Sequence, residues 1–381
     1  MTTAELSDFL ILGGGIAGAS AGFFLAEHGS VTVLEAEDAP GYHATGRSAA
    51  LFTEYFGNRC IRALTTASRS FYAAPPAGFA EHPLLTPRGV VMLAPAGAED
   101  RFAASLAEAS RDPTIPPLHE IGPDEVQRLC PAVRRGWYGR ALHKPAAMDV
   151  DVHGAHHGFL RGLRSRGGRV VAGAEAQEIV RDRGDGMWRV STPAGTFAAK
   201  LLINAAGAWA DAVAGLAGVR PVGLSAMRRT AFTFDPPAGT EVASWPMVTD
   251  LDDTFYVKPE AGRLLASPCD ETPMPPCDVQ ADEIDVATAA ARVEEVTTLT
   301  IRRVTHRWAG LRTFVRDRTV VVGEAPAAPG FFWLAGQGGY GIQTAPAVAR
   351  ACAALATEGR LPADLARLGI TEAELSPARF S

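Results

Sequence analysis

The sequence predicts a mixed α/β (α+β) fold, in which an antiparallel-sheet domain is inserted in two pieces into a domain with a doubly wound parallel sheet. Three observations predict it. Near the N-terminus, a glycine-rich turn joins a short apolar run to a helix-like segment. Two later apolar runs also end in glycine-rich turns. Between these segments, one stretch is rich in Pro and aromatic residues, and another alternates apolar with polar residues as a half-buried strand does.

The first glycine-rich turn has the spacing of a dinucleotide-binding βαβ unit. It reads G-x-G-x-x-G over residues 13–18, and the next apolar run ends at Glu35, 22 residues after the first glycine. This pattern is typical of a Rossmann-type domain. Gly13 permits the tight turn, Gly15 lets the backbone approach a pyrophosphate at the helix N-terminus, and Gly18 lets the helix pack on the strand. Glu35 would accept hydrogen bonds from ribose hydroxyls and repel a 2′-phosphate, which disfavours an NADP-type ligand.

Residues 9–26 are almost uncharged and could instead be an export or membrane segment. The residues before them carry Glu5 and Asp8 but no Lys or Arg, whereas a signal peptide needs a basic start. Five glycines in the stretch would make a poor membrane-spanning helix. No other window reaches spanning length, so we expect a soluble, cytoplasmic protein without a transmembrane segment.

The composition points to a globular protein of two domains. The chain has 381 residues, 47% of them hydrophobic, and a net charge of −6, which argues against a nucleic-acid partner. The cysteines are odd in number and lack C-x-x-C spacing, so they predict neither a disulfide framework nor a zinc site. His156 and His157 are adjacent and face different sides of a helix, so no metal site is expected.

The first domain is assembled from three chain segments, which we place at residues 1–51, 149–220 and 318–381. After the initial βαβ unit, the pattern predicts a helix over 153–166, a strand over 169–172, a hairpin around 184–186, strands over 201–204 and 331–334, and a helix from about 345. The inserted domain takes residues 52–148 and 221–317. Alternation over 231–234 and 254–257 predicts strands there, and 286–299 resembles a helix.

The second and third glycine-rich turns favour FAD over NAD as the dinucleotide. Ala205-Ala206-Gly207 follows an apolar strand and suits a close approach of the backbone to an adenosine. The turn at 338–341 opens a helix whose positive end would favour negative charge on a reduced flavin ring. An NAD enzyme needs only the first turn, whereas the three turns together indicate FAD.

Several segments resemble the D-amino-acid oxidase/glycine oxidase family, most of all the bacterial catabolic D-arginine dehydrogenases. The resemblance runs from about Asp8 to about Pro377, and it is carried by residues 13–18, Glu35, 41–50, 204–209, 308–312, 337–343 and 376–377. It implies oxidative deamination of a D-amino acid to a 2-oxo acid and ammonia, with hydride transfer from Cα to flavin N5. The implied partner is a small-molecule amino acid, and the electron acceptor is a quinone or O₂.

The resemblance also assigns site residues. An Arg fork meets a carboxylate with two parallel hydrogen bonds, and of the candidates Arg228, Arg229 and Arg312 the family pattern selects the last two together with Tyr256. The carbonyl of Gly339 resembles the acceptor for the substrate amine. The implied FAD contacts are Gly13, Gly15, Ala17, Gly18, Glu35, Ala36, Ala44, Thr45, Gly46, Arg47, Ser48, Ala49, Ala50, Leu51, Ala176, Ala206, Gly207, Trp209, Gly336, Gly338, Gly339, Tyr340, Gly341, Ile342 and Gln343.

Three positions depart from the D-arginine enzymes, and all three lose polarity. Val90 stands where they carry a Glu, Leu51 where they carry a His, and Phe56 where they carry a Tyr. Burying a guanidinium without a counter-charge costs on the order of several kcal/mol, so D-arginine should be a poor substrate and an apolar or aromatic side chain a good one. Glu54 and Tyr55 are neighbours that could restore polarity.

The flavin is expected to be bound without a covalent link. In related N-methylglycine-type enzymes a His in this part of the chain can be joined to the flavin, but the residues around His43 resemble the non-covalent branch. Two other functions stay open. The same carboxylate site would serve a secondary amine, an imino acid or an L-2-hydroxy acid, and a non-catalytic flavoprotein is a third class, which the presence of both arginines disfavours.

Overall fold

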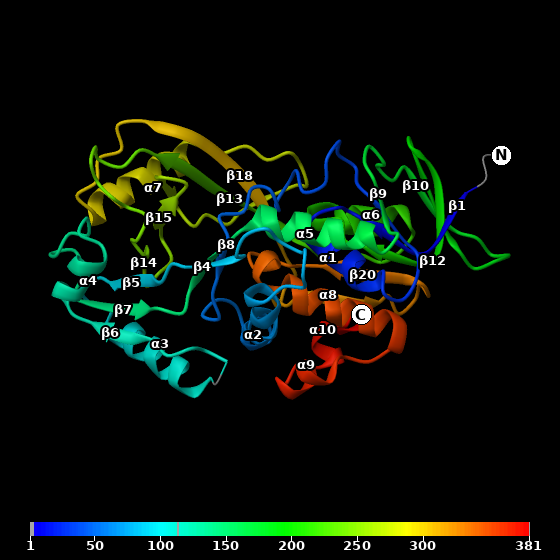
Figure 1. Ribbon diagram of the computed structural model, residues 1–381, viewed down its shortest axis with the longest axis horizontal. Helices are drawn as coiled ribbons and strands as arrows, with labels where there is room; N and C mark the ends of the chain where they lie inside the picture. The colour runs from blue at the N-terminus through cyan, green and yellow to red at the C-terminus, as the bar shows by residue number, and fades with distance from the viewer. Residues whose placement is uncertain (1–3, 113, 381) are drawn as a thin grey trace.

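The computed structural model describes residues 4–112 and 114–380. It contains two large sheets and a small three-stranded sheet, and the large sheets occupy the two halves of the molecule in Figure 1. The predicted mixed α/β fold, with a Rossmann-type sheet and a second sheet domain, is confirmed.

The first sheet is the Rossmann-type sheet. Strands β20, β12, β1, β2 and β9 pair in parallel, and β10, β11 and β19 add antiparallel partners at its edges. The β10–β11 hairpin turns at the predicted Gly184-Asp185-Gly186. The strands are β1 (Glu5–Leu12), β2 (Val31–Leu34), β9 (Arg169–Val171), β10 (Glu178–Arg181), β11 (Trp188–Thr192), β12 (Gly195–Asn204), β19 (Val321–Glu324) and β20 (Phe331–Ala335).

Helices pack on this sheet, and α1 lies against both α5 and α8. Apolar side chains of β1, β2, β20 and α8 form one buried cluster. The helices here are α1 (Ile16–Leu25), α5 (Val152–Ser165), the 3₁₀ turn η1 (Gly207–Trp209), α6 (Ala210–Leu216) and α8 (Gly341–Glu358). The chain ends in α9 (Ala363–Arg367), α10 (Glu372–Leu375) and η2 (Pro377–Phe380).

Helix α8 begins at Gly341, four residues before the predicted start. Pro346 lies inside it and cannot donate a backbone hydrogen bond to the carbonyl of Ile342. The hydroxyl of Tyr72 donates to that carbonyl instead, at 2.5 Å. The hydroxyl of a residue distant in the sequence therefore replaces the backbone donor that Pro346 lacks. The helix extends back to the glycine-rich turn.

The second sheet combines strands from both pieces of the predicted inserted domain. Its pairings are antiparallel except that β14 runs parallel to β5, so the expectation of a purely antiparallel sheet is wrong at that pairing, where the two chain pieces meet. The strands are β5 (Val90–Ala94), β6 (His119–Ile121), β7 (Arg140–Lys144), β13 (Ser225–Phe234), β14 (Met247–Asp250), β15 (Tyr256–Glu260), β16 (Arg263–Ser267), β17 (Thr272–Met274) and β18 (Val304–Phe314).

Three helices accompany the second sheet. They are α3 (Glu99–Arg111), α4 (Pro123–Leu129) and α7 (Glu283–Val296). Helix α7 contacts β13, β15 and β16. It starts and ends about three residues earlier than predicted, because the side chain of Asp282 caps its N-terminus by accepting from Ile284 N–H and Thr297 already has an extended backbone.

The small sheet and one helix cross the predicted domain boundaries. The sheet joins β3 (Leu51–Phe52), β4 (Leu85–Pro87) and β8 (Met148–Val150). Helix α2 (Arg59–Ala73) was assigned to the inserted domain, but its apolar face packs on α8 and belongs to the core of the first sheet. The residue boundaries of the two domains stay a prediction. Within the described residues, no helix is both long and apolar enough to cross a membrane.

Candidate active site

A cavity of about 1130 Å³ lies where the carboxyl ends of the parallel strands meet the second sheet. Ligand pockets for one small molecule occupy roughly 300–1,000 Å³, so this cavity has room for a dinucleotide and a small substrate together. One end is lined by the first two glycine-rich turns and the residues after β2. The other end is lined by charged and aromatic side chains of the second sheet.

The first glycine-rich turn is shaped by close backbone approaches. Gly13 has a φ of +104°, which favours glycine. A Cβ on Gly18 would lie 1.9 Å from the carbonyl oxygen of Gly13, so only glycine lets α1 sit this close to β1. The carboxylate of Glu35 accepts from Gly14 N–H at 2.7 Å and from Glu37 N–H at 3.0 Å, and it lines the cavity. Glu35 therefore stabilises the turn by hydrogen bonding, and it lies where a ribose is expected.

The segment 41–50 forms a second wall of the same end. The hydroxyl of Thr45 accepts from Ile16 N–H at 2.9 Å, at the N-terminus of α1. The guanidinium of Arg47 donates to the carbonyls of Val279 and Ala309 at 3.0 and 3.2 Å, which fastens the segment to the second sheet.

His43 lies at the dinucleotide end of the cavity rather than beside the arginines. Its Nε2 is 2.7 Å from a carboxylate oxygen of Glu37, and its ring centre is 4.6 Å from that of Trp209. Glu37 follows Glu35 by two residues, so His43 lies near the expected ribose.

At the other end, the turn before α8 meets strand β18. Gly338 N–H donates to the carbonyl of Thr313 at 2.8 Å. A Cβ on Gly339 would lie 2.9 Å from a guanidinium nitrogen of Arg312. The side chain of Arg312 therefore lies against the Gly339 backbone, at the N-terminus of the helix that was expected to face a flavin.

The structure brings Arg229, Arg312 and Tyr256 together at this end of the cavity. On the paired strands β13 and β18, Arg229 is opposite Gly310 and Arg312 is opposite Met227, so the arginines are diagonal neighbours on one face. Among the described residues, no carboxylate lies within ion-pair distance of Arg312. Burial and the nearby charge of Arg229 lower the pKa of Arg312.

Polar contacts hold the side chain of Arg229, and Tyr256 is buried. The Nε of Arg229 donates to the carbonyl of Asp270 at 2.8 Å, and one terminal nitrogen is 3.6 Å from Glu271. Burial raises the pKa of Tyr256, so its hydroxyl stays protonated and can donate a hydrogen bond. The three side chains form a site that suits a carboxylate.

Of the three predicted pocket residues, Leu51 and Phe56 line the cavity and Val90 does not. Val90 is 1% exposed and packs in an apolar cluster with the cavity-lining residues Met247 and Tyr256. The structure therefore does not place Val90 among the lining residues, and its role in the pocket stays a prediction. A carboxylate placed at this position would be buried among apolar side chains.

The suggested substitute, Glu54, is also not available to a substrate. It is 2% exposed, and its two oxygens accept from Arg69 at 2.6 and 2.7 Å. The hydroxyl of Tyr55 donates to the carbonyls of Pro116 and Pro117, although its ring lines the cavity. Neither residue supplies a free charge to the pocket.

Asp253 is a cavity residue that the sequence analysis missed. It lies in the turn between β14 and β15 with a φ of +51°, and its carboxylate has no hydrogen-bond or ion-pair partner in the described part of the chain. Asp253 is exposed toward the open cavity, where partial desolvation raises its pKa and the charge of Lys144 opposes that shift. The ammonium of Lys144 lies behind the wall, 4.9 Å from the ring centre of Tyr55, and burial lowers its pKa to about 8. An isolated Asp in a turn gave no sequence signal.

Most of the predicted FAD contacts line the cavity, and three do not: Gly18, Gly46 and Gly336. Gly18 serves the packing of α1 on the turn. Gly46 closes the 41–46 turn, since its N–H donates to the carbonyl of Gly41 at 2.8 Å. Gly336 has a φ of +74° and forms the bend after β20. These glycines shape the wall without facing the cavity. Other lining residues that were not predicted include Met247, Cys269, Glu271 and Arg318.

The residues present fit FAD. A glycine turn at a helix N-terminus offers backbone N–H groups to a pyrophosphate, Glu35 is placed for a ribose, and a second helix N-terminus lies beside the arginines. When bound, FAD would supply a two-electron acceptor at the arginine end. Among the described residues, no group of three or more His, Cys, Asp or Glu side chains could hold a metal ion.

Comparison with known proteins agrees with this assignment. A family model described as FAD dependent oxidoreductase (DAO) matches residues 8–355. Among curated relatives, mitochondrial dimethylglycine dehydrogenase of Mus musculus is 26% identical over 149 residues, which are 39% of this chain and 17% of that protein. The uncharacterized oxidoreductase YurR of Bacillus subtilis is 23% identical and is covered over 98% of both chains. The chain thus spans less than a fifth of the dimethylglycine dehydrogenase.

Two solved structures show the same fold. L-Proline dehydrogenase from P. horikoshii superimposes with a TM-score of 0.84 at 20% identity, over 99% of this chain and 98% of that one. Glycine oxidase from Geobacillus kaustophilus gives 0.82 at 22% identity, over 97% and 99%. The fold and site define a FAD-dependent oxidoreductase. The chain belongs to the DAO family of these enzymes, and its cofactor is FAD.

Proposed function

We propose that this enzyme oxidises D-amino acids to 2-oxo acids and ammonia. The observation that carries the proposal is the pair Arg229 and Arg312, held on one face beside Tyr256, with Arg312 lacking a carboxylate partner in the described chain. Two half-buried cations that share one counter-charge, Glu271 at 3.6 Å from Arg229, favour a ligand that brings its own carboxylate. The site lies beside Gly339, where the flavin is expected.

The residues of the chain would bind and orient the substrate. The arginines would hold its carboxylate, the protonated hydroxyl of Tyr256 would donate to it, and the carbonyl of Gly339 would accept from the neutral amine. Orienting the Cα hydrogen in this way is the protein's main contribution to the reaction. The imine product hydrolyses in water. The D configuration is supported by the family resemblance in sequence.

The walls near the carboxylate site favour an apolar side chain. Leu51, Phe56 and Met247 line the cavity, and Glu54 is neutralised by Arg69. An apolar side chain gains about 25 cal/mol for each Å² that it removes from water. We therefore propose substrates such as D-leucine, D-methionine or D-phenylalanine.

Asp253 supports a second candidate, in which the side chain ends in a hydrogen-bond donor. Its unpartnered carboxylate lines the cavity, and although desolvation raises its pKa, the charges of Lys144, Arg229 and Arg312 oppose that rise. A long side chain with an apolar stem and a donor at its end would satisfy this carboxylate.

A substrate panel separates these candidates. For the apolar candidate, we expect kcat/KM for D-leucine to exceed that for D-arginine, and Asp253→Asn to change the value for D-leucine by less than about threefold, since surface-like polar changes cost little when no partner is lost. A preference for D-arginine that disappears in Asp253→Asn would establish the second candidate. Sarcosine, D-proline and L-lactate belong in the same panel, and activity confined to one of them would replace the D-amino-acid assignment.

We expect the FAD to be bound without a covalent bond. His43 pairs with Glu37 at the dinucleotide end of the cavity, away from the arginines, so its ring is poorly placed to reach a flavin. Acid precipitation of the holoenzyme should release the yellow colour into the supernatant. Colour that stays in the pellet of the wild type but not of a His43→Ala variant would show a covalent link at that residue.

A further inference from the structure

A second ion pair borders the carboxylate site. Arg318 and Glu271 both line the cavity, and a guanidinium nitrogen of Arg318 donates to Oε1 of Glu271 at 2.7 Å. The same oxygen is 3.6 Å from a terminal nitrogen of Arg229. Glu271 therefore lies between the two arginines, and its shorter, hydrogen-bonded contact is with Arg318.

The position of Glu271 affects how a substrate carboxylate can bind to Arg229. A Glu271 released from Arg318 could move onto Arg229 and form the charge-assisted pair that the proposed function reserves for the substrate carboxylate. The two carboxylates would then compete for one guanidinium. The contact between Arg318 and Glu271 removes that competitor.

Arg318 is held in a conformation that it would not adopt unaided. Its φ is +56°, in the left-handed region that disfavours residues with a Cβ. Such a conformation persists where surrounding contacts impose it. Its N–H donates to the carbonyl of Val315 at 2.9 Å, and its guanidinium carbon lies 3.8 Å from the ring centre of Phe314.

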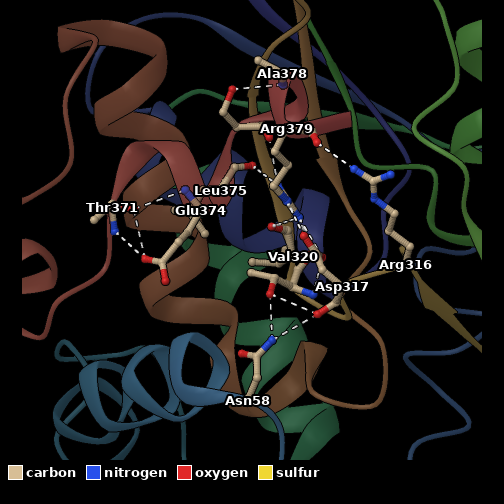
Figure 2. Close-up of polar contacts among 11 residues, drawn as sticks. Asn58, Arg316, Asp317, Val320, Thr371, Glu374, Leu375, Ala378 and Arg379 are labelled. Carbon is tan, nitrogen blue, oxygen red and sulfur yellow. Dashed lines mark hydrogen bonds and ion pairs between the residues drawn. The ribbon is translucent and has the colours of Figure 1, made fainter. Parts of the chain in front are cut away.

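The contacts that impose the turn come largely from the C-terminal segment, as Figure 2 shows. Nε of Arg379 donates to the carboxylate of Asp317 at 2.8 Å, and one of its terminal nitrogens donates to the carbonyl of Thr319 at 2.6 Å. The other carboxylate oxygen of Asp317 accepts from Thr319 N–H at 3.0 Å. Asn58 adds a hydrogen bond to the hydroxyl of Thr319 at 2.7 Å. Arg379 thus forms hydrogen bonds with the residues on both sides of Arg318, Asp317 and Thr319.

Arg379 is itself fixed within the C-terminal segment. Its second terminal nitrogen donates to the carbonyls of Leu375 and Ser376 at 2.8 and 3.0 Å. Its side chain is 14% exposed. Burial raises the pKa of Asp317, but the hydrogen bonds from Arg379 and Thr319 outweigh it and leave that pKa lowered.

We propose that Arg379 is a positioning residue for substrate binding: through Asp317 it sets the turn that carries Arg318, and Arg318 prevents Glu271 from forming a hydrogen-bonded pair with Arg229. The proposal rests on the carboxylate site of the proposed function. It does not depend on which amine is oxidised there.

The test measures carboxylate binding to the holoenzyme, with benzoate as the probe and the flavin absorbance as the signal. Arg379→Ala should weaken benzoate binding about tenfold and raise KM for the best substrate, with kcat within about threefold of wild type, because a competing ion pair acts on binding. Adding Glu271→Gln to Arg379→Ala should restore most of the affinity. A purely structural defect would not be rescued by removing that charge.

Arg59→Ala is the matched control. Arg59 pairs with Glu374 in the same C-terminal segment and is 48% exposed, but it makes no hydrogen bond or ion pair with residues 315–319 of the described chain. It should leave benzoate affinity within about twofold of wild type, as exposed pairs contribute little. If Arg379→Ala proves too unstable to purify, Arg318→Ala with and without Glu271→Gln tests the same competition without touching the C-terminus.

Two results would overturn the proposal: no rescue by Glu271→Gln in either background, or equal weakening by Arg59→Ala and Arg379→Ala. A failure of the proposed function would give a different set of results. A wild-type enzyme that binds benzoate with this pattern of variants, yet oxidises no D-amino acid, would keep the positioning role and lose only the substrate assignment. Absence of benzoate binding to the wild type would reject the carboxylate site and the positioning role together.

Discussion

Replacing Arg312 with Met is expected to lower kcat/KM for the best substrate at least about a hundredfold while FAD stays bound. Arg312 lies against Gly339 and has no carboxylate partner among the described residues, so its replacement leaves no protein carboxylate unpaired. The variant would lose its charge-assisted hydrogen bonds to the substrate carboxylate, each worth about 1.5–3 kcal/mol in favourable cases. The substrate Cα would also be misplaced. Arg229→Met should act in the same direction.

Arg307→Met is the control for this experiment. Arg307 is on the same strand β18, is 51% exposed and pairs with Glu283 outside the cavity. Steady-state kinetics and the flavin spectrum of each purified variant supply the comparison. An Arg312→Met enzyme with near wild-type efficiency would mean that the substrate carboxylate binds elsewhere.

Replacing Gly18 with Ala is expected to abolish FAD binding, with affinity at least about a hundredfold weaker. The added Cβ would lie 1.9 Å from the Gly13 carbonyl, against ordinary contacts beyond 3 Å, so α1 would have to move away from the turn that receives the pyrophosphate. Helix propensity alone would predict the opposite result, because Ala stabilises a helix interior by about 1 kcal/mol relative to Gly. Titration of the apoprotein with FAD measures it.

Gly215→Ala makes the same substitution in a helix where the added Cβ meets no atom within 4 Å. It should leave FAD affinity unchanged and not lower the melting temperature. If Gly18→Ala binds FAD as the wild type does, then α1 and the first turn do not form the pyrophosphate site.

The sequence was sufficient to predict the parts of the molecule that depend on local geometry. The turn at 13–18 could be predicted because a tight turn, a close backbone approach and a close helix packing each require glycine at a fixed spacing. The parallel strands followed as short apolar runs between such turns. Glu35 was identifiable because its distance from the turn is set by one βαβ unit.

The rest depends on contacts between distant segments. Val90 was assigned to the pocket by position in a family pattern, but the pairing of β5 with β14 sets it beside Met247, in an apolar cluster where it is buried. The start of α8 depends on the hydroxyl of Tyr72, far away in the chain. Asp253 reaches the cavity only because two strands place their connecting turn there. No periodicity or local motif in the sequence predicts these contacts between distant segments.

The most direct test of the central claim is anaerobic mixing of the holoenzyme with D-leucine and, separately, with L-leucine, while the flavin absorbance is followed. We predict that D-leucine bleaches the flavin and yields one equivalent of 2-oxo acid and ammonia as the imine hydrolyses, and that the colour returns when an acceptor is admitted. We also predict that L-leucine does not bleach the flavin and that Arg312→Met abolishes the bleaching. Oxygen and a quinone can be compared as acceptors on the reduced enzyme. A flavin that no D-amino acid reduces, or one that L-leucine reduces faster than D-leucine, would contradict the proposed function.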